Sequence, residues 1–281
     1  MKIIITTDST SDLPKEIIEK EKISVMPLNV NLEDNTFEDG VNIGPDEIFN
    51  FVDRTNILPK TGARSTYSYK EFFETQLKEH NADAIIHIAL SSELSSSHDN
   101  ALIAANELGY VKVVNTLSLS SGCGLLVLSA VDKVNANKSI DEIVCELEEE
   151  RNKVQASFIV DSLDYLYKGG RCSALSLFGA NILRIKPKIK LKDGKLGVDK
   201  KYMGKFEQVV LTYVRDLMKA YENANKNRVF ITYTTRNEEL VKKIRNILTE
   251  NGFQNIIENS AGSTIASHCG RNTLGVLFMD L

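Results

Sequence analysis

The chain of 281 residues contains no tryptophan and only four cysteines, four histidines and five prolines. Its cysteines, Cys123, Cys145, Cys172 and Cys269, are far apart in the sequence and form no C-x-x-C motif. This spacing favours reduced thiols over a disulfide framework or a zinc site. Because histidines are also few, we expect no metal site and no metal cofactor.

Long apolar runs and an excess of one charge are missing as well. No window approaches the roughly 20 apolar residues that a membrane-spanning helix needs. The N-terminal segment turns polar after Thr6, too early for a signal peptide. The 34 Lys and Arg and 38 Asp and Glu give a net charge of -4 without long blocks of either sign. We therefore expect a cytoplasmic protein with no membrane span and no nucleic-acid partner.

Apolar residues make up 42% of the chain, enough for a sizeable core and one or two domains. In the first half, strand-like apolar runs alternate with segments of helical periodicity. The predicted strands are 2–6, 23–30, 84–90 and 111–114, and the predicted helices include 69–77 and 100–108. Such alternation predicts a mostly parallel sheet covered by helices, a three-layer α/β/α arrangement.

The second half has a different order of elements. A capping box, Ser139 followed by Glu142, predicts an acidic helix that leads into it. A turn signal at Lys192-Asp193-Gly194 predicts a hairpin. The other expected features are a strand at 157–160, a short helix ending at Gly169-Gly170, an apolar stretch to Leu183, helices at 206–221 and 238–249, and strands at 229–233 and near Ile256 and Val276. The prediction is an α/β protein whose second domain has a mixed sheet, with domains at 1–150 and 151–281.

Serine and threonine are concentrated in short windows beside these elements, at 6–12, 61–66, 91–97, 115–122 and 260–268. Three of the windows follow predicted parallel strands, so they should meet at the edge of the sheet where ligands of such folds bind. Hydroxyl groups and free amides at helix starts suit an oxyanion, either carboxylate or phosphate. Those three windows contain no histidine that could act as a general base, which favours binding over catalysis.

Five segments resemble, in order and spacing, the motifs of the DegV family: TDSTSDLP at 7–14, SSELS at 91–95, SLDYLYKGGRCS at 162–173, IKPKIKLKDGKL at 185–196 and SHCGRNTLGV at 267–276. The resemblance extends over nearly the whole chain. It implies a two-domain protein that binds one long-chain fatty acid in a buried tunnel between its domains. It also implies that the chain is no enzyme and needs no cofactor, but presents the carboxylate to a separate fatty acid kinase that makes acyl phosphate.

The same resemblance implies roles for individual residues. Thr61, Ser95 and His268 match the positions that hold the carboxylate, and Arg171 matches a position that faces the kinase or the head group. The residues expected to support these loops are Ser92, Ser96, Asp8, Ser9 and Gly270.

The ligand loops also depart from the family pattern. Ser96 stands where the family has glycine, and serine adopts positive φ at a higher energetic cost than glycine does. Gly62-Ala63-Arg64, Asn115-Thr116 and Arg271-Asn272 replace other family residues. We expect Arg64 and Arg271 to add positive charge near an anionic head group.

Alternatives remain open for the function and for single residues. Asp8 follows the first strand, as in phosphotransferases and hydrolases with an aspartate nucleophile, although the second acid two residues on is absent. A lipid sensor without a kinase partner is a further alternative; no nucleotide-binding glycine motif is present. In simpler roles, Asp8 and Ser9 would cap a helix near Leu13, Ser95 would be an N-cap, and His87 would be a core histidine.

Overall fold

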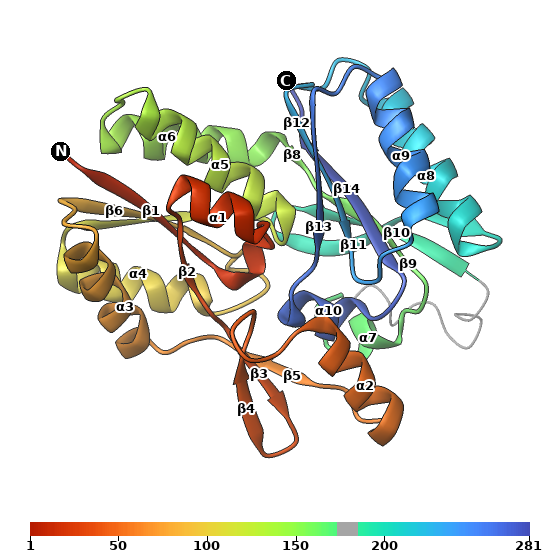
Figure 1. The fold of residues 1–281 in the computed structure, drawn as a ribbon, viewed down its shortest axis with the longest axis horizontal. Helices are drawn as coiled ribbons and strands as arrows, with labels where there is room; N and C mark the ends of the chain where they lie inside the picture. Colours follow the sequence, from red (N-terminus) through yellow and green to blue (C-terminus); the bar gives the residue numbers. More distant parts are fainter. Residues whose placement is uncertain (173–184) are drawn as a thin grey trace.

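The computed structural model describes residues 1–172 and 185–281 (Figure 1). The predicted apolar stretch to Leu183 falls largely on 173–184, outside the described residues. The chain forms a four-stranded sheet from its first part, a seven-stranded sheet from its last part, and a small three-stranded sheet.

The first sheet is parallel throughout and has the strand order β2-β1-β6-β7. Its strands are β1 (Ile3–Asp8), β2 (Ser24–Met26), β6 (Ala84–Ala89) and β7 (Val111–Asn115). Successive side chains point to opposite faces: Ile4 packs toward α3 (Thr66–Glu79) and α4 (Ser97–Leu108), whereas Ile5 packs toward α5 (Ser121–Asn135). Helices α1 (Lys15–Glu21) and α6 (Ile140–Glu150) lie on the α5 face. This is the predicted three-layer arrangement, and Ser139 and Glu142 form the predicted capping box of α6.

One strand prediction is wrong. The run 23–30 is divided, because β2 ends at Met26 and Asn29 starts β3 (Asn29–Leu32) in another sheet. Pro27 stands at the break, and proline has no N–H to continue a ladder. Strand β3 pairs antiparallel with β4 (Asn35–Glu38) and β5 (Lys60–Gly62), and α2 (Pro45–Thr55) connects those two. This small sheet, which was not predicted, carries Thr61.

The large sheet is mixed, as predicted, with the order β11-β10-β9-β14-β12-β13 and β8 paired to β14. Its strands are β8 (Val154–Gln155), β9 (Ser157–Val160), β10 (Ile185–Lys192), β11 (Lys195–Met203), β12 (Arg228–Tyr233), β13 (Asn255–Ser260) and β14 (Thr273–Met279). The predicted β10–β11 hairpin is confirmed, and Asp193 and Gly194 in its turn both have positive φ, as a two-residue turn of this kind requires.

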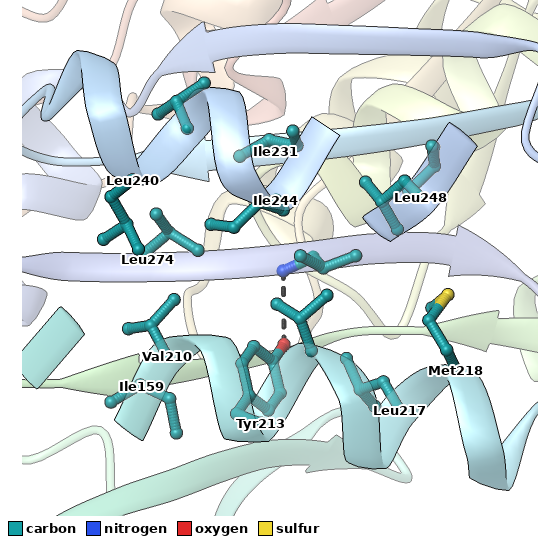
Figure 2. Packing of buried hydrophobic residues seen from close by; sticks show 14 of the residues in the cluster. Ile159, Val210, Tyr213, Leu217, Met218, Ile231, Leu240, Ile244, Leu248 and Leu274 are labelled. Atoms are coloured by element: carbon teal, nitrogen blue, oxygen red, sulfur yellow. Dashed lines mark hydrogen bonds between the residues drawn. The ribbon is translucent and has the colours of Figure 1, made fainter. Parts of the chain in front are cut away.

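Helices α8 (Phe206–Ala220) and α9 (Glu238–Glu250) cover one face of this sheet (Figure 2). The Tyr213 hydroxyl, buried among them, accepts a hydrogen bond from the Val276 amide at 3.2 Å and donates one to the Ser157 carbonyl at 2.6 Å. On the other face of the sheet, Phe230 and Leu277 pack in one hydrophobic core with residues of α5. Helix α5 therefore packs against both sheets, and the domain boundary near residue 150 stays a prediction.

Short elements complete the fold around the junction of the two halves. They are the 3-10 turns η1 (Ser9–Ser11) and η2 (Arg151–Lys153), and the helices α7 (Asp164–Lys168) and α10 (Ser263–Cys269). Helix α10 contacts η1, β3, β5, α2 and α7, so it joins the small sheet to the C-terminal half. No helix among residues 1–172 and 185–281 is long and apolar enough to cross a bilayer.

Candidate functional site

A cavity lies where the loops of the two halves meet; it is partly open, and its free space, solvent at the opening included, is about 570 Å³. Most of its wall is apolar. It is lined by Thr10, Leu28, Thr61, Gly62, Ala63, Leu90, Leu94, Ser95, Leu119, Leu166, Arg171, Leu196, Thr264, Ile265, His268 and Cys269. The four residues predicted to contact the head group or the kinase, Thr61, Ser95, Arg171 and His268, all belong to this wall.

Thr61 and His268 are in direct contact although they are 207 positions apart: Thr61 Oγ1 and His268 Nε2 form a hydrogen bond of 2.8 Å. Strand β5 carries Thr61, and the last turn of α10 carries His268. His268 Nδ1 has no partner among the described residues and faces Gly169, where an added Cβ would lie 2.5 Å from it. Gly169 therefore gives the imidazole the room that it occupies.

The charge state of His268 follows from its surroundings. Burial lowers its pKa to about 4, and the positive charge of Arg171 acts in the same direction. The imidazole is therefore neutral near pH 7 in the free protein. A neutral ring still donates one hydrogen bond, so His268 and Thr61 can contact a carboxylate together.

Ser95 lies in the loop between β6 and α4. Its hydroxyl oxygen accepts a hydrogen bond from the Ser97 amide at 3.2 Å and lies 3.0 Å from Ser97 Oγ. The N-cap position itself belongs to Ser96, whose side chain makes no capping bond. Ser96 has φ −73°, so the serine that replaces a family glycine causes no backbone strain.

Arg171 lies at the solvent edge of the cavity. Its side chain is exposed, and its guanidinium donates a hydrogen bond of 2.8 Å to the Gly169 carbonyl. Among the described residues of the cavity wall, it is the one that carries a permanent charge.

The predicted supporting residues do not line the cavity. Ser92 accepts a hydrogen bond from the Asn115 amide at 2.8 Å. Ser9 donates to Asp39 at 2.9 Å and accepts from the Leu28 amide at 3.1 Å. These hydroxyls brace neighbouring loops; Ser9 does not cap a helix at Leu13, because α1 begins at Lys15.

Gly270 is a supporting residue with a specific steric reason. It follows α10 with φ 74° and ψ −179°, a conformation essentially limited to glycine. An added Cβ would lie 2.7 Å from the Tyr165 ring. Gly270 therefore lets the chain turn after His268 while α7 packs closely against it.

Asp8 is enclosed by a hydrogen-bond network. Its side chain is 1% exposed, and its two oxygens accept hydrogen bonds from the Tyr69 hydroxyl at 2.5 Å and from the Leu90 amide at 3.0 Å. The neighbouring His87 is fully buried and bonds to Thr6 Oγ1 at 2.9 Å, as expected of a core histidine. Asp8 forms no capping hydrogen bond with its side chain, so the interpretation of Asp8 as a helix cap is wrong. Because both oxygens are occupied and Asp8 is not a wall residue of the cavity, a nucleophilic role is disfavoured.

The two arginines at the family departures make ion pairs outside the cavity wall. Arg64 contacts Glu38 at 2.7 Å, and Arg271 contacts Asp53 at 2.6 Å and stacks over the Phe49 ring. Each guanidinium is held by a carboxylate of the N-terminal half. The expectation that the two arginines add positive charge near an anionic head group stays a prediction.

A second, inner cavity adjoins the first, with a free space of about 330 Å³ that includes open solvent. The two share Leu119, Ile265 and Cys269 as wall residues. Its other lining residues are Ser120, Phe158, Thr232, Tyr233, Thr234, Ala261, Thr273, Gly275 and Leu277. Sequence reasoning missed this inner part; the signal available was the face of α10, where positions 264, 265, 268 and 269 follow helical spacing.

Two buried carboxylates position α10. Asp12 accepts a hydrogen bond from the Gly262 amide at 2.8 Å, and Asp39 accepts one from the Ser263 amide at 2.7 Å. Burial, helped by the charge of nearby Asp39, raises the pKa of Asp12 to about 8 against the opposing hydrogen bonds from Ser120 and Gly262. Neither aspartate was among the predicted site residues.

Comparison with known proteins agrees with this architecture. A family model described as "Uncharacterised protein, DegV family" matches residues 2–281. The chain belongs to the DegV family. A DegV domain-containing protein of Clostridium acetobutylicum is 34% identical, with 99% of each chain covered. A protein of Thermotoga maritima named fatty acid-binding protein is 30% identical over 98% of this chain and 96% of its own length.

Among solved structures, a DegV family protein from Thermus thermophilus described for its fatty acid binding has a TM-score of 0.91. It is 30% identical, and each chain is fully covered. The two-domain α/β architecture expected of DegV proteins is thereby confirmed for this chain. Within the described ranges, no group of three or more His, Cys, Asp or Glu side chains could hold a metal ion.

Proposed function

We propose that this DegV protein binds one long-chain fatty acid, with its carboxylate at Thr61, Ser95 and His268 and its acyl chain in the inner cavity. The observation that carries this proposal is that two mainly apolar cavities lie side by side and share Leu119, Ile265 and Cys269 as wall residues, with the hydroxyl and imidazole groups of Thr61, Ser95 and His268 in the wall of the first. Fatty-acid-binding relatives of similar sequence and fold support it.

The energetics of fatty acid binding fit apolar walls for the acyl chain and a few polar groups for the carboxylate. Each CH₂ group removed from water contributes about 0.8 kcal/mol, so the apolar walls supply most of the affinity. A buried carboxylate is costly unless it is hydrogen-bonded. Thr61 and Ser95 can donate to it, and its negative charge would favour protonation of His268.

We further propose that the protein has no catalytic residue of its own and presents the carboxylate to a separate fatty acid kinase in the cytoplasm. The main cavity is partly open to solvent, and the exposed Arg171 belongs to its wall. A guanidinium there can pair with phosphate oxygens through two parallel hydrogen bonds. A lipid sensor without a kinase would need the same cavity but no exposed cation beside it, so Arg171 favours the kinase role.

The direct test is mass spectrometry of the small molecules released when the purified protein is denatured. We expect one long-chain fatty acid per chain. A ligand-free preparation should then take up palmitic acid from solution. Consistent absence of a fatty acid from several preparations, together with no palmitic acid uptake, would refute the proposal.

A further inference from the structure

Two threonines in the wall of the main cavity have hydroxyl groups to which no described residue forms a hydrogen bond. Thr10 is 1% exposed and Thr264 is 6% exposed, and neither Oγ1 atom has a hydrogen-bond partner among the described residues. Buried hydroxyls without a partner are destabilising and uncommon, so each one calls for an explanation. Both belong to residues that line the same cavity.

The hydroxyls that line the inner cavity, by contrast, are all paired. Ser120 donates to Asp12, Thr232 to Asn259, Thr234 to the Gly270 carbonyl and Thr273 to the Cys269 carbonyl. With these groups occupied, the inner wall is suited to a plain hydrocarbon chain. Thr10 and Thr264 differ from them because their hydrogen-bonding capacity remains unused.

The two threonines have a defined position relative to the head-group residues. Thr264 precedes His268 by four residues on α10, so the two share a helix face and are separated by about 6 Å along the axis. Thr10 comes from η1, which packs against α10 and is fixed to it by the Asp12–Gly262 hydrogen bond. A ligand carboxylate at His268 would therefore bring the first part of the acyl chain toward these hydroxyls.

We propose that Thr10 and Thr264 form a polar subsite for a hydroxyl or oxo group on the acyl chain close to the carboxylate. The ligand class is then an oxygenated long-chain fatty acid, such as a β-hydroxy acid. A ligand hydroxyl can donate to one threonine and accept from the other, which satisfies both buried groups at once. This inference rests on the proposed fatty-acid-binding function.

The experiment compares the affinities of palmitic, β-hydroxypalmitic and ω-hydroxypalmitic acid for the full chain and for Thr10→Val and Thr264→Val. Valine has nearly the shape of threonine, being branched at the same carbon, and replaces the hydroxyl with a methyl group. We expect the wild type to bind the β-hydroxy acid about tenfold more tightly than palmitic acid, as one or two neutral hydrogen bonds would allow. Each valine variant should lose this preference and keep its affinity for palmitic acid. Thr212→Val, on the exposed surface of α8, is the matched control and should retain it.

Three results would overturn the inference. The wild type could bind both acids equally, or the valine variants could keep the wild-type ratio. Alternatively, the valine substitutions could weaken the binding of palmitic acid as strongly as that of the β-hydroxy acid. The threonine hydroxyls would then bind the carboxylate itself. Failure of the fatty-acid function gives a different result, because the wild type would then bind none of the three acids. Thermal denaturation confirms that the valine variants are folded, and equal or higher stability is expected because an unpaired buried hydroxyl is removed.

Discussion

Asp12 and Gly262 are 250 positions apart in the sequence, yet the Gly262 amide donates a hydrogen bond of 2.8 Å to the Asp12 carboxylate. This bond ties the turn after the first strand to the start of α10, the helix that carries His268. Because burial raises the pKa of Asp12 to about 8, the carboxyl is largely protonated at neutral pH.

The Asp12 pKa predicts a pH-dependent stability. In the unfolded chain its pKa is about 3.9, so folding takes up a proton between that value and about 8. This group therefore makes the protein less stable as pH rises through that range, with no further loss above it. Asp12→Asn mimics the protonated acid and should remove this slope. Thermal denaturation should show similar stability for both proteins at or below about pH 4 and a more stable variant at about pH 8.

A control of opposite sign is available in Asp216. Its pKa is lowered by hydrogen bonds from Lys200 and Tyr202, so its ionised form is favoured by folding. Asp216→Asn should therefore reduce stability at neutral pH and have less effect in acid. If the wild type and Asp12→Asn keep a constant stability difference across the range, the raised Asp12 pKa is wrong.

The head-group assignment predicts a specific loss of affinity. Thr61→Val and Ser95→Ala each remove one hydroxyl from the cavity wall and should weaken fatty acid binding by about 1 to 3 kcal/mol if the carboxylate is buried against them. Displacement of a fluorescent fatty acid measures this. Ser92→Ala is the control, since Ser92 pairs with Asn115 outside the cavity. Equal affinities in all three variants would contradict the assignment.

Local signals predicted the hairpin turn at Asp193-Gly194 and the capping box at Ser139 because the neighbouring residues alone determine them. The parallel sheet followed from its regular alternation with helices. Thr61 and His268 are 207 positions apart, and no rule of sequence spacing connects them. Only the resemblance to a family predicted that both lie at the carboxylate. The buried Asp12 and the inner cavity were missed, because burial and distant partners decide both.

His268 predicts proton uptake on ligand binding. Its pKa is lowered to about 4 in the free protein, and a carboxylate beside it would raise the pKa by favouring the imidazolium. At about pH 5, between the free and the raised values, binding should therefore take up a fraction of a proton. Calorimetry in two buffers of different ionisation enthalpy measures this uptake. His268→Gln should abolish it; uptake that persists in that variant would assign the proton to another group.

We predict that Arg171 contributes little to fatty acid affinity and much to acyl phosphate formation. Its side chain is exposed, so its attraction to a bound carboxylate is weak, at about 1 kcal/mol or less. The same guanidinium can hold phosphate oxygens through two hydrogen bonds as acyl phosphate forms. Arg171→Ala should therefore reduce acyl phosphate formation by a fatty acid kinase much more than it reduces fatty acid affinity.

The assay measures acyl phosphate with radiolabelled ATP, alongside fatty acid affinity for the same preparations. Lys168→Ala removes another exposed cation, from α7, that does not line the cavity, and it should leave acyl phosphate formation near the wild-type rate. Equal losses in both variants would mean that general positive charge attracts the kinase. A large loss of bound fatty acid in Arg171→Ala would instead make Arg171 a ligand-holding residue and contradict the proposed division of roles.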